Sequence, residues 1–125
     1  MRYLALVTDY DGTLAADDRV FPEAMDALRR VRSSGRRSIL ITGRCLDDLF
    51  KVCDCASLFD LIVAENGAIL FDPVSREEIR LANPPPKLLL RGLRARGIEP
   101  LEVGQVVIAM HAPHRQAAQD VVWEL

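Results

Sequence analysis

Tyr3–Thr13, with the sequence YLALVTDYDGT, joins an apolar run to two acids, a glycine and a threonine. Apolar and polar residues do not alternate over positions 3–7, which predicts a strand covered on both faces, as in the parallel sheets of α/β proteins. Such sheets bind ligands at the carboxyl ends of their strands. Asp9 and Asp11 come just past that end, and residues two apart in an extended chain point the same way. We therefore expect two carboxylates in one small volume, where a shared cation or proton offsets their repulsion.

The chain then alternates helices and strands. An exposed acidic loop is expected at 15–20. A helix with one apolar face then begins at Pro22 and stops at Gly35. Apolar strands are predicted at 38–41 and 61–64, on either side of a second helix that begins at about Leu46. Because short connections join these β-α units, they predict an α/β fold with a right-handed, doubly wound parallel sheet.

The second half of the chain begins with a predicted hairpin, with strands at 68–71 and 78–81. Three prolines at 84–86 hold an extended conformation and mark the best boundary, between domains at 1–82 and 83–125. Beyond it we expect a helix from 87 to about 96, a strand at 103–110 and a helix from about 115. The apolar face of that last helix comprises Ala117, Ala118, Val121, Val122 and Leu125.

Composition narrows the class of protein. The 125 residues are 50% hydrophobic and 27% charged, enough for one ordinary core. A net charge of −2 argues against a nucleic-acid partner, although a solvated helix face or a binding patch could explain one cluster of arginines. These are Arg29, Arg30, Arg32, Arg36 and Arg37. The chain has neither a secretory signal nor a transmembrane run, so we expect no membrane partner and a cytoplasmic location.

Cysteine and histidine give weaker signals. Cys53 and Cys55 are interpreted as reduced structural thiols, because a zinc site needs more ligands nearby. His111 and His114 resemble a metal pair, but the proline between them breaks the helix that would align them. Cys45 beside Arg44 suggests either a thiol of lowered pKa or small-residue packing, and packing is the simpler reading.

The pattern Asp-x-Asp-Gly-Thr at 9–13, directly after an apolar strand, resembles motif I of the haloacid dehalogenase-like (HAD) phosphohydrolases. Thr42-Gly43-Arg44, one β-α unit later, resembles motif II. Glu65-Asn66-Gly67-Ala68 resembles the Cof-type branch, whose members carry a large α/β cap after that strand. The resemblance covers the first half of a Rossmannoid HAD-like core, residues 1–82, and the start of an α/β cap at 83–125.

The resemblance implies a role for each acid. Asp9 would be the nucleophile that forms an aspartyl-phosphate, and Asp11 would protonate the leaving oxygen and then activate water. Asp9 and Asp11 would also hold Mg²⁺, a hard cation that prefers oxygen ligands. Asn66 could meet the substrate, but a turn residue before glycine is the favoured reading. The expected phosphate-binding and substrate-binding residues are Gly12, Thr13, Thr42, Gly43, Arg44 and Asn66.

The sequence departs from the family in two respects. The family also needs a lysine from motif III and acids from motif IV, and neither Lys51 nor Lys87 matches such a context. The resemblance therefore implies a truncated chain that is inactive or weakly active by itself. It also implies that the strand at 3–7 has a neighbour on one side only. An unprotected apolar edge strand predicts self-association.

The leading hypothesis is a Mg²⁺-dependent phosphomonoester hydrolase that acts on a small phosphorylated metabolite such as a sugar phosphate. The alternative is a phosphate-binding or metal-binding module of a larger protein that does not itself catalyse a reaction. A response-regulator receiver is disfavoured, because it needs an aspartate at the end of the third strand, where this chain has Ala64-Glu65.

Overall fold

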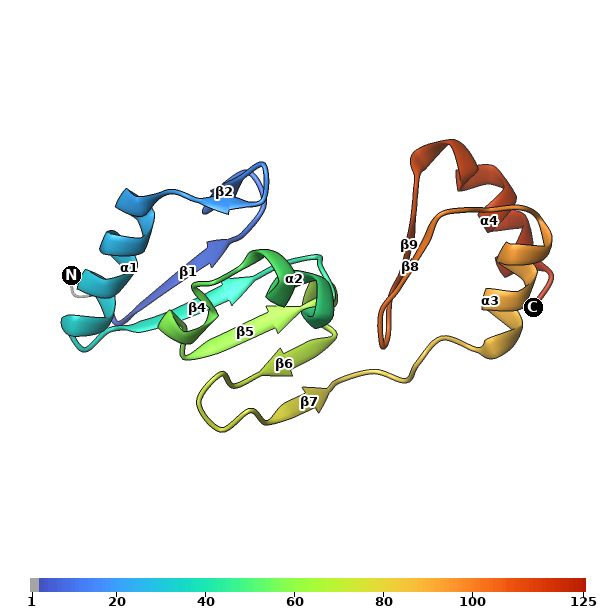
Figure 1. The fold of residues 1–125 in the computed structure, drawn as a ribbon. Helices are drawn as coiled ribbons and strands as arrows, with labels where there is room; N and C mark the ends of the chain where they lie inside the picture. Colours follow the sequence, from blue (N-terminus) through green and yellow to red (C-terminus); the bar gives the residue numbers. More distant parts are fainter. Residues whose placement is uncertain (1–2) are drawn as a thin grey trace. The chain divides into compact units, whose positions relative to one another are not determined.

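The computed structural model describes residues 3–125, which form two compact units divided between Leu81 and Ala82 (Figure 1). The first unit contains every motif named above. Its strands are β1 (Ala5–Asp9), β2 (Ala15–Ala16), β3 (Arg19–Val20), β4 (Arg37–Ile41), β5 (Leu61–Ala64), β6 (Ile69–Phe71) and β7 (Glu78–Arg80). Its helices are α1 (Pro22–Ser33) and α2 (Leu46–Val52), with single 3-10 turns η1 (Ala56–Leu58) and η2 (Glu65–Gly67).

The main sheet has five strands in the order β1-β4-β5-β6-β7. The first three are parallel, and their register aligns Thr8 with Leu40 and Leu40 with Ile62. The predicted hairpin is confirmed: β6 and β7 are antiparallel, and β6 extends the sheet by pairing antiparallel with β5. The alternation of strands and helices thus produces the α/β sheet that the sequence predicts, with the antiparallel β6–β7 hairpin added at one edge.

Burial of β4 and β5 is one-sided, and no residue of β1 is buried. Leu40 and Ile62, which share a face, are fully buried, whereas Val7 and Ile41 on the opposite face are 54% and 40% exposed. Both β-α-β crossovers run in the same direction across the sheet, so right-handed connections put α1 and α2 on one face. The prediction that β1 is covered on both faces is therefore wrong for the part of the chain described. The order also leaves β1 at the edge of the sheet, as expected.

Helix α1 begins and ends where the sequence predicts. Pro22 is its first residue, and Leu28 on its apolar face is 2% exposed. Gly35 has a φ of +75°, and its N–H donates to the carbonyl of Arg32 at 3.0 Å, which closes the last turn. The helix therefore returns the chain to the sheet directly before β4.

The expected loop at 15–20 is instead a small antiparallel hairpin of β2 and β3. Asp17 and Asp18 form its turn with φ angles of +50° and +60°. Two-residue hairpin turns of this hand suit the right-handed twist of strands, and aspartate tolerates left-handed angles better than most residues. Strands of two residues are too short for an alternating pattern to predict them.

The second unit comprises α3 (Lys87–Ala95), β8 (Leu101–Val103), β9 (Ile108–Met110), the 3-10 turn η3 (Ala112–His114) and α4 (Arg115–Trp123). The single strand predicted at 103–110 is wrong, because the chain turns at 104–107, where the N–H of Gly104 donates to the carbonyl of Val107. The core of this unit consists of Leu93, Ile98, Ala118 and Val121.

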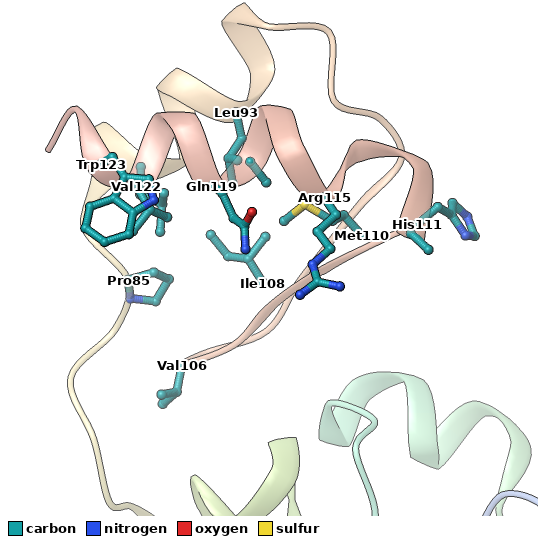
Figure 2. A pocket seen from close by; sticks show the side chains of 13 residues that line it. Pro85, Leu93, Val106, Ile108, Met110, His111, Arg115, Gln119, Val122 and Trp123 are labelled. Atoms are coloured by element: carbon teal, nitrogen blue, oxygen red, sulfur yellow. The ribbon is translucent and has the colours of Figure 1, made fainter.

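One face of α4 differs from the expectation. Ala118 and Val121 are buried, but Val122 and Leu125 are 58% and 63% exposed. Val122 lines a cavity of about 620 Å³ between α3, α4 and β9, and Ile108 and Met110 form part of its wall (Figure 2). No described helix has the length and apolar character needed to cross a bilayer.

Candidate active site

The two acids of the first motif flank a buried anchor. Asp9 is the last residue of β1 and is exposed, and its Oδ1 accepts a hydrogen bond from the Tyr10 N–H at 2.8 Å. The Tyr10 side chain is fully buried, and its hydroxyl donates to the carbonyl of Val52 at the end of α2 at 3.1 Å. Burial raises the pKa of Tyr10 to about 12. This anchor fixes the residue between the two carboxylates.

The chain leaves β1 through a tight turn. Gly12 has a φ of +71°, an angle that glycine adopts without strain, and its N–H donates to the carbonyl of Ala15 at 2.9 Å. The N–H groups of Leu14 and Ala15 both donate to the Tyr10 carbonyl, at 3.0 and 2.9 Å. The sharp exit expected at Gly12 is confirmed. Gly12 and Thr13 are exposed within this turn.

Thr42 follows β4 at the same edge of the sheet. Its side chain is 4% exposed, and its N–H donates to the Val63 carbonyl of β5 at 2.9 Å. Its Oγ1 accepts a hydrogen bond from the N–H of Arg44 at 3.1 Å. The hydroxyl is thus held at the carboxyl end of the sheet by the backbone two residues further on.

A run of three residues with left-handed angles follows β5: Glu65, Asn66 and Gly67 have φ of +50°, +55° and +99°. Asparagine and glycine tolerate these angles, but a glutamate with this conformation is strained, and such strain is concentrated at functional sites. The N–H groups of Glu65 and Asn66 donate to the carbonyls of Arg44 and Thr42, at 3.0 and 3.2 Å. The turn therefore docks directly on the second motif.

Gly43 permits that docking. A Cβ built on Gly43 would lie 3.0 Å from Oδ1 of Asn66, which is tighter than ordinary contacts between such atoms. Asn66 thus occupies a turn, and its side chain also lies against the second motif. Both interpretations of Asn66 given above are compatible with this position.

These elements surround a cavity of about 440 Å³ at the carboxyl ends of β1, β4 and β5. Four residues singled out from the sequence line it: Asp9, Thr42, Gly43 and Asn66. Ile41, Val63 and Gly67 complete the wall. Asp11, Gly12, Thr13 and Arg44 are not part of this lining.

Asp11 and Arg44 are instead joined to each other. Nε and Nη2 of Arg44 donate to the two carboxylate oxygens of Asp11 at 2.8 and 2.7 Å, and Nη2 also donates to Asp18 of the β2–β3 hairpin at 2.5 Å. The Arg44 guanidinium lies 5.5 Å from the centre of the Tyr10 ring. Hydrogen bonding from Arg44 lowers the pKa of Asp11, and the same bonds raise the pKa of Arg44. In this arrangement Asp11 is an ionised acceptor, so it can act as a proton donor only after Arg44 releases it.

Two residues of the site were missed by sequence reasoning. Asp18 gave no signal beyond being one of several acids in a polar segment, and its contact depends on the hairpin. Glu65 was noted only as part of a motif, yet it is 2% exposed. A buried carboxylate is unusual, and this one lies within the strained turn.

The side chains at this site supply only part of the ligand set that a hard cation such as Mg²⁺ needs. Asp9 and Asp11 supply oxygen atoms, which Mg²⁺ prefers, and Mg²⁺ usually retains several waters with one or two carboxylates. Among residues 3–125 no three histidine, cysteine or acidic side chains are grouped closely enough to hold a metal. The three cysteines are free thiols, and His111 and His114 belong to no such group.

Comparison with known sequences agrees with these motifs. The profile of the haloacid dehalogenase-like hydrolases matches residues 6–89, more than half of the chain. A phosphoglycolate phosphatase from Pyrobaculum islandicum is 36% identical over 73 residues, which is 56% of this chain and 32% of that protein. The chain thus spans about a third of the length of this curated relative.

Solved structures agree as well. A phosphatase of the haloalkanoate (HAD) superfamily from Bacteroides thetaiotaomicron is 28% identical, with a TM-score of 0.61 over 96% of this chain and 47% of that one. A haloacid dehalogenase-like hydrolase from B. subtilis is 26% identical, with a TM-score of 0.54 over 62% of this chain and 27% of that one. A HAD subclass IIB sugar phosphatase, 24% identical, shares the fold with a TM-score of 0.60 over 92% of this chain and 46% of that one. The chain belongs to the haloacid dehalogenase-like hydrolase family.

Proposed function

We propose that this chain carries the nucleophile and part of the phosphate-binding site of a Mg²⁺-dependent phosphomonoester hydrolase. The observation that supports it best is the cavity in which the Asp9 carboxylate meets Thr42, Gly43 and Asn66. An exposed carboxylate beside a hydroxyl and backbone amides is the combination that nucleophilic attack on a phosphate ester requires. Residues 1–82 then form part of the catalytic core, and residues 83–125 form part of a cap.

The reaction has two steps. In the first, an oxygen of Asp9 attacks phosphorus, the bond to the ester oxygen breaks, and that oxygen takes a proton from Asp11 to leave as an alcohol. In the second, Asp11 accepts a proton from water as the water oxygen attacks phosphorus, which releases phosphate and restores the Asp9 carboxylate. Thr42, Gly43, Gly12, Thr13 and Asn66 bind the phosphoryl oxygens or the substrate.

Arg44 has a second role in this proposal. It holds Asp11 as a carboxylate in the structure described, and an incoming phosphate competes with Asp11 for the guanidinium, since arginine binds both groups bidentately. Release of Asp11 removes the hydrogen bonds that lower its pKa, so once substrate has bound Asp11 more readily takes up the proton that it gives to the leaving oxygen.

Mg²⁺ is the cofactor in this proposal. The Asp9 carboxylate and an oxygen of Asp11 would hold it, and it would offset the negative charge that the carboxylate and the phosphate bring together. The substrate is a small phosphorylated metabolite. The relative named phosphoglycolate phosphatase makes phosphoglycolate the first compound to assay, with sugar phosphates next. A cytoplasmic location is part of the proposal and agrees with three free thiols.

A non-catalytic phosphate-binding module is the second candidate. Two observations favour it. Asp11 forms an ion pair with Arg44, and within residues 3–125 no further acid joins Asp9 and Asp11 in a metal-binding group. Such a module would bind inorganic phosphate without forming a covalent bond to it.

Trapping of the intermediate separates the two candidates. The chain, and any longer protein that contains it, is mixed with Mg²⁺ and phosphorus-labelled p-nitrophenyl phosphate and then quenched in acid. We expect label on the peptide that contains Asp9, sensitive to hydroxylamine as acyl phosphates are, and no label without Mg²⁺. Phosphate binding without any covalent label in either protein would favour the binding module and refute the hydrolase.

A further inference from the structure

Cys53 and Cys55, directly after α2, form a close thiol pair. Their Sγ atoms are 2.9 Å apart, roughly 0.9 Å more than the disulfide bond length of about 2.04 Å. Cys53 is 4% exposed and Cys55 is fully buried, yet Asp54 between them is exposed. The pair is therefore buried, although the residue between the two cysteines in the sequence reaches solvent.

The local structure allows this pair to open. Cys53 is the C-cap of α2, a helix of only seven residues, and its N–H donates to the Leu49 carbonyl at 2.8 Å. The end of a short helix opens at a small cost in free energy, which exposes buried thiols to small reagents. The hydrogen bond with Cys55 also lowers the pKa of Cys53, so Cys53 is the thiol that ionises first.

Tyr10 connects the pair to the candidate site. The residue before Cys53 is Val52, whose carbonyl accepts the Tyr10 hydroxyl at 3.1 Å. The Tyr10 carbonyl in turn accepts the N–H groups of Leu14 and Ala15 in the turn that follows Asp11. A displacement of Cys53 therefore reaches this turn through two hydrogen-bonded steps, because Tyr10 is fully buried and its neighbours must adjust when its anchor moves.

We propose that Cys53 and Cys55 are a reversible disulfide site, and that closure of this disulfide alters the turn after Asp11 through Val52 and Tyr10. The oxidant is a small-molecule disulfide such as oxidised glutathione. The Cys53 thiolate attacks one sulfur of that molecule and releases the first glutathione thiolate. The Cys55 thiolate then attacks Sγ of Cys53 and releases the second. The two cysteines lose two electrons and two protons in total, and these convert glutathione disulfide into two thiols.

The first experiment counts thiols across glutathione redox buffers. After acid quench and alkylation, mass spectrometry of the whole chain should show three alkyl groups when reduced. When oxidised it should show one alkyl group, on Cys45, and a loss of two hydrogens. The Cys45→Ser variant, which keeps a hydrogen-bonding group toward Asp48, should lose the same two hydrogens. This control excludes a disulfide that involves Cys45.

The concentration dependence identifies the product. For an intramolecular disulfide, the oxidised fraction of the protein depends on the squared glutathione concentration divided by the glutathione disulfide concentration. An about 80-fold decrease in that quotient raises the oxidised fraction from one tenth to nine tenths. A mixed disulfide with glutathione follows the simple ratio and adds mass. Persistent mixed disulfides, or three alkylated thiols in every buffer, would overturn the proposal without the need for any variant that removes a buried cysteine.

The second experiment tests whether closure of the disulfide alters the turn after Asp11 through Val52 and Tyr10. Amide hydrogen exchange at Leu14 and Ala15 should be about fivefold faster in the oxidised chain, the change that one ordinary hydrogen bond controls. In the Tyr10→Phe variant, which lacks the hydroxyl, oxidation should still remove two hydrogens but should leave these exchange rates unchanged. Equal rates in the oxidised and reduced chain, or the same response in Tyr10→Phe, would overturn the link to the turn.

Discussion

Arg44 contacts three side chains that come from separate parts of the sequence: Asp11 after β1, Asp18 in the β2–β3 hairpin and the Tyr10 ring. An arginine can do this because its planar fork presents several donors in fixed directions. It therefore lowers the pKa of Asp11 and also links Asp11 to the hairpin.

The first prediction concerns that control. In Arg44→Gln the hydrogen bonds that lower the pKa of Asp11 are lost, so its pKa should rise toward the ordinary aspartate value of about 3.9. Carboxyl-carbon NMR titration of the chain measures this directly. Arg37→Gln is the matched control, because Arg37 pairs with Asp60 and should leave Asp11 unchanged. An Asp11 titration identical in Arg44→Gln and the parent chain would contradict the ion pair.

The lowered pKa of Asp11 also determines how the stability of the fold should change with pH. The pKa of Asp11 is lower in the folded chain than in the unfolded chain. The ion pair therefore stabilises the fold fully at a pH above the pKa of Asp11 in the unfolded chain, and this stabilisation is lost as the pH falls through its pKa in the folded chain. The stability difference between the parent chain and Arg44→Gln should therefore be constant above about pH 5 and shrink in more acidic solution.

Asp9 supports the second prediction. Asp9→Asn is nearly isosteric and removes the oxygen anion that we propose attacks phosphorus, so it should lower phosphatase activity by about 10³-fold or more in any active protein that contains this chain. Asp17→Asn is the control, since Asp17 is an exposed turn residue with left-handed angles that asparagine also tolerates. Activity near that of the parent in Asp9→Asn would show that another residue attacks phosphorus.

At the scale of elements, the third prediction concerns how α3 packs on α4. A Cβ on Gly92 would lie 2.6 Å from Cγ1 of Val121, which is 3% exposed. Alanine favours a helix over glycine by about 1 kcal/mol, but overpacking against a β-branched side chain costs about 1–3 kcal/mol. Gly92→Ala should therefore destabilise this unit by about 1 kcal/mol, measured by denaturant unfolding with circular dichroism and Trp123 fluorescence.

The Val121→Ala background provides the control for this prediction. There the overlapping methyl group is absent, so Gly92→Ala should fill space and gain helix propensity, and its effect should change sign. A destabilisation of the same size in both backgrounds would show that the close approach of the two helices is not the cause.

The elements that the sequence predicted share strong local signals. Helix α1 has a proline at its start and a left-handed glycine after its end, and β5 is an apolar run found at the predicted residues. The β2–β3 hairpin was missed because its strands have two residues each. The turn between β8 and β9 was missed because apolar residues continue on both sides of it and Gly104 was read as part of a strand.

The candidate site could be predicted only as far as residue types and strand ends allow. That Asp9, Thr42, Gly43 and Asn66 share a cavity follows from parallel strands that end at one edge. The Arg44–Asp11 pair could not be predicted, because it depends on the reach of a long side chain across two loops. The exposure of β1 was misjudged, because a run of apolar residues does not show how many faces its neighbours cover.

At the scale of the whole molecule, β1 is an exposed edge strand that can pair with another chain. Within residues 3–125 it pairs with β4 alone, and Leu4 and Val7 are 73% and 54% exposed. An apolar edge strand of this kind offers unpaired backbone groups to a second chain. We therefore propose that two copies associate through β1, with their strands side by side.

The fourth prediction tests that association. Sedimentation equilibrium over a range of concentrations should show a dimer, and Val7→Lys should shift the equilibrium toward monomer, because lysine on an edge strand opposes pairing. Val74→Lys is the matched control: Val74 is 76% exposed in the turn between β6 and β7, and its replacement should change nothing. A parent chain that stays monomeric at high micromolar concentration would refute the proposal.

The position of β1 also has a consequence for the order of synthesis. Ribosomes make chains from the N-terminus, so β1 emerges before β4, yet the partner of Ala5 is Arg37, on the far side of a hairpin and a helix. Until β4 emerges, the nascent segment has an apolar strand without a template to complete it. Folding of this protein in the cell should therefore depend on how fast translation passes β4, and a pause placed between α1 and β4 should increase aggregation.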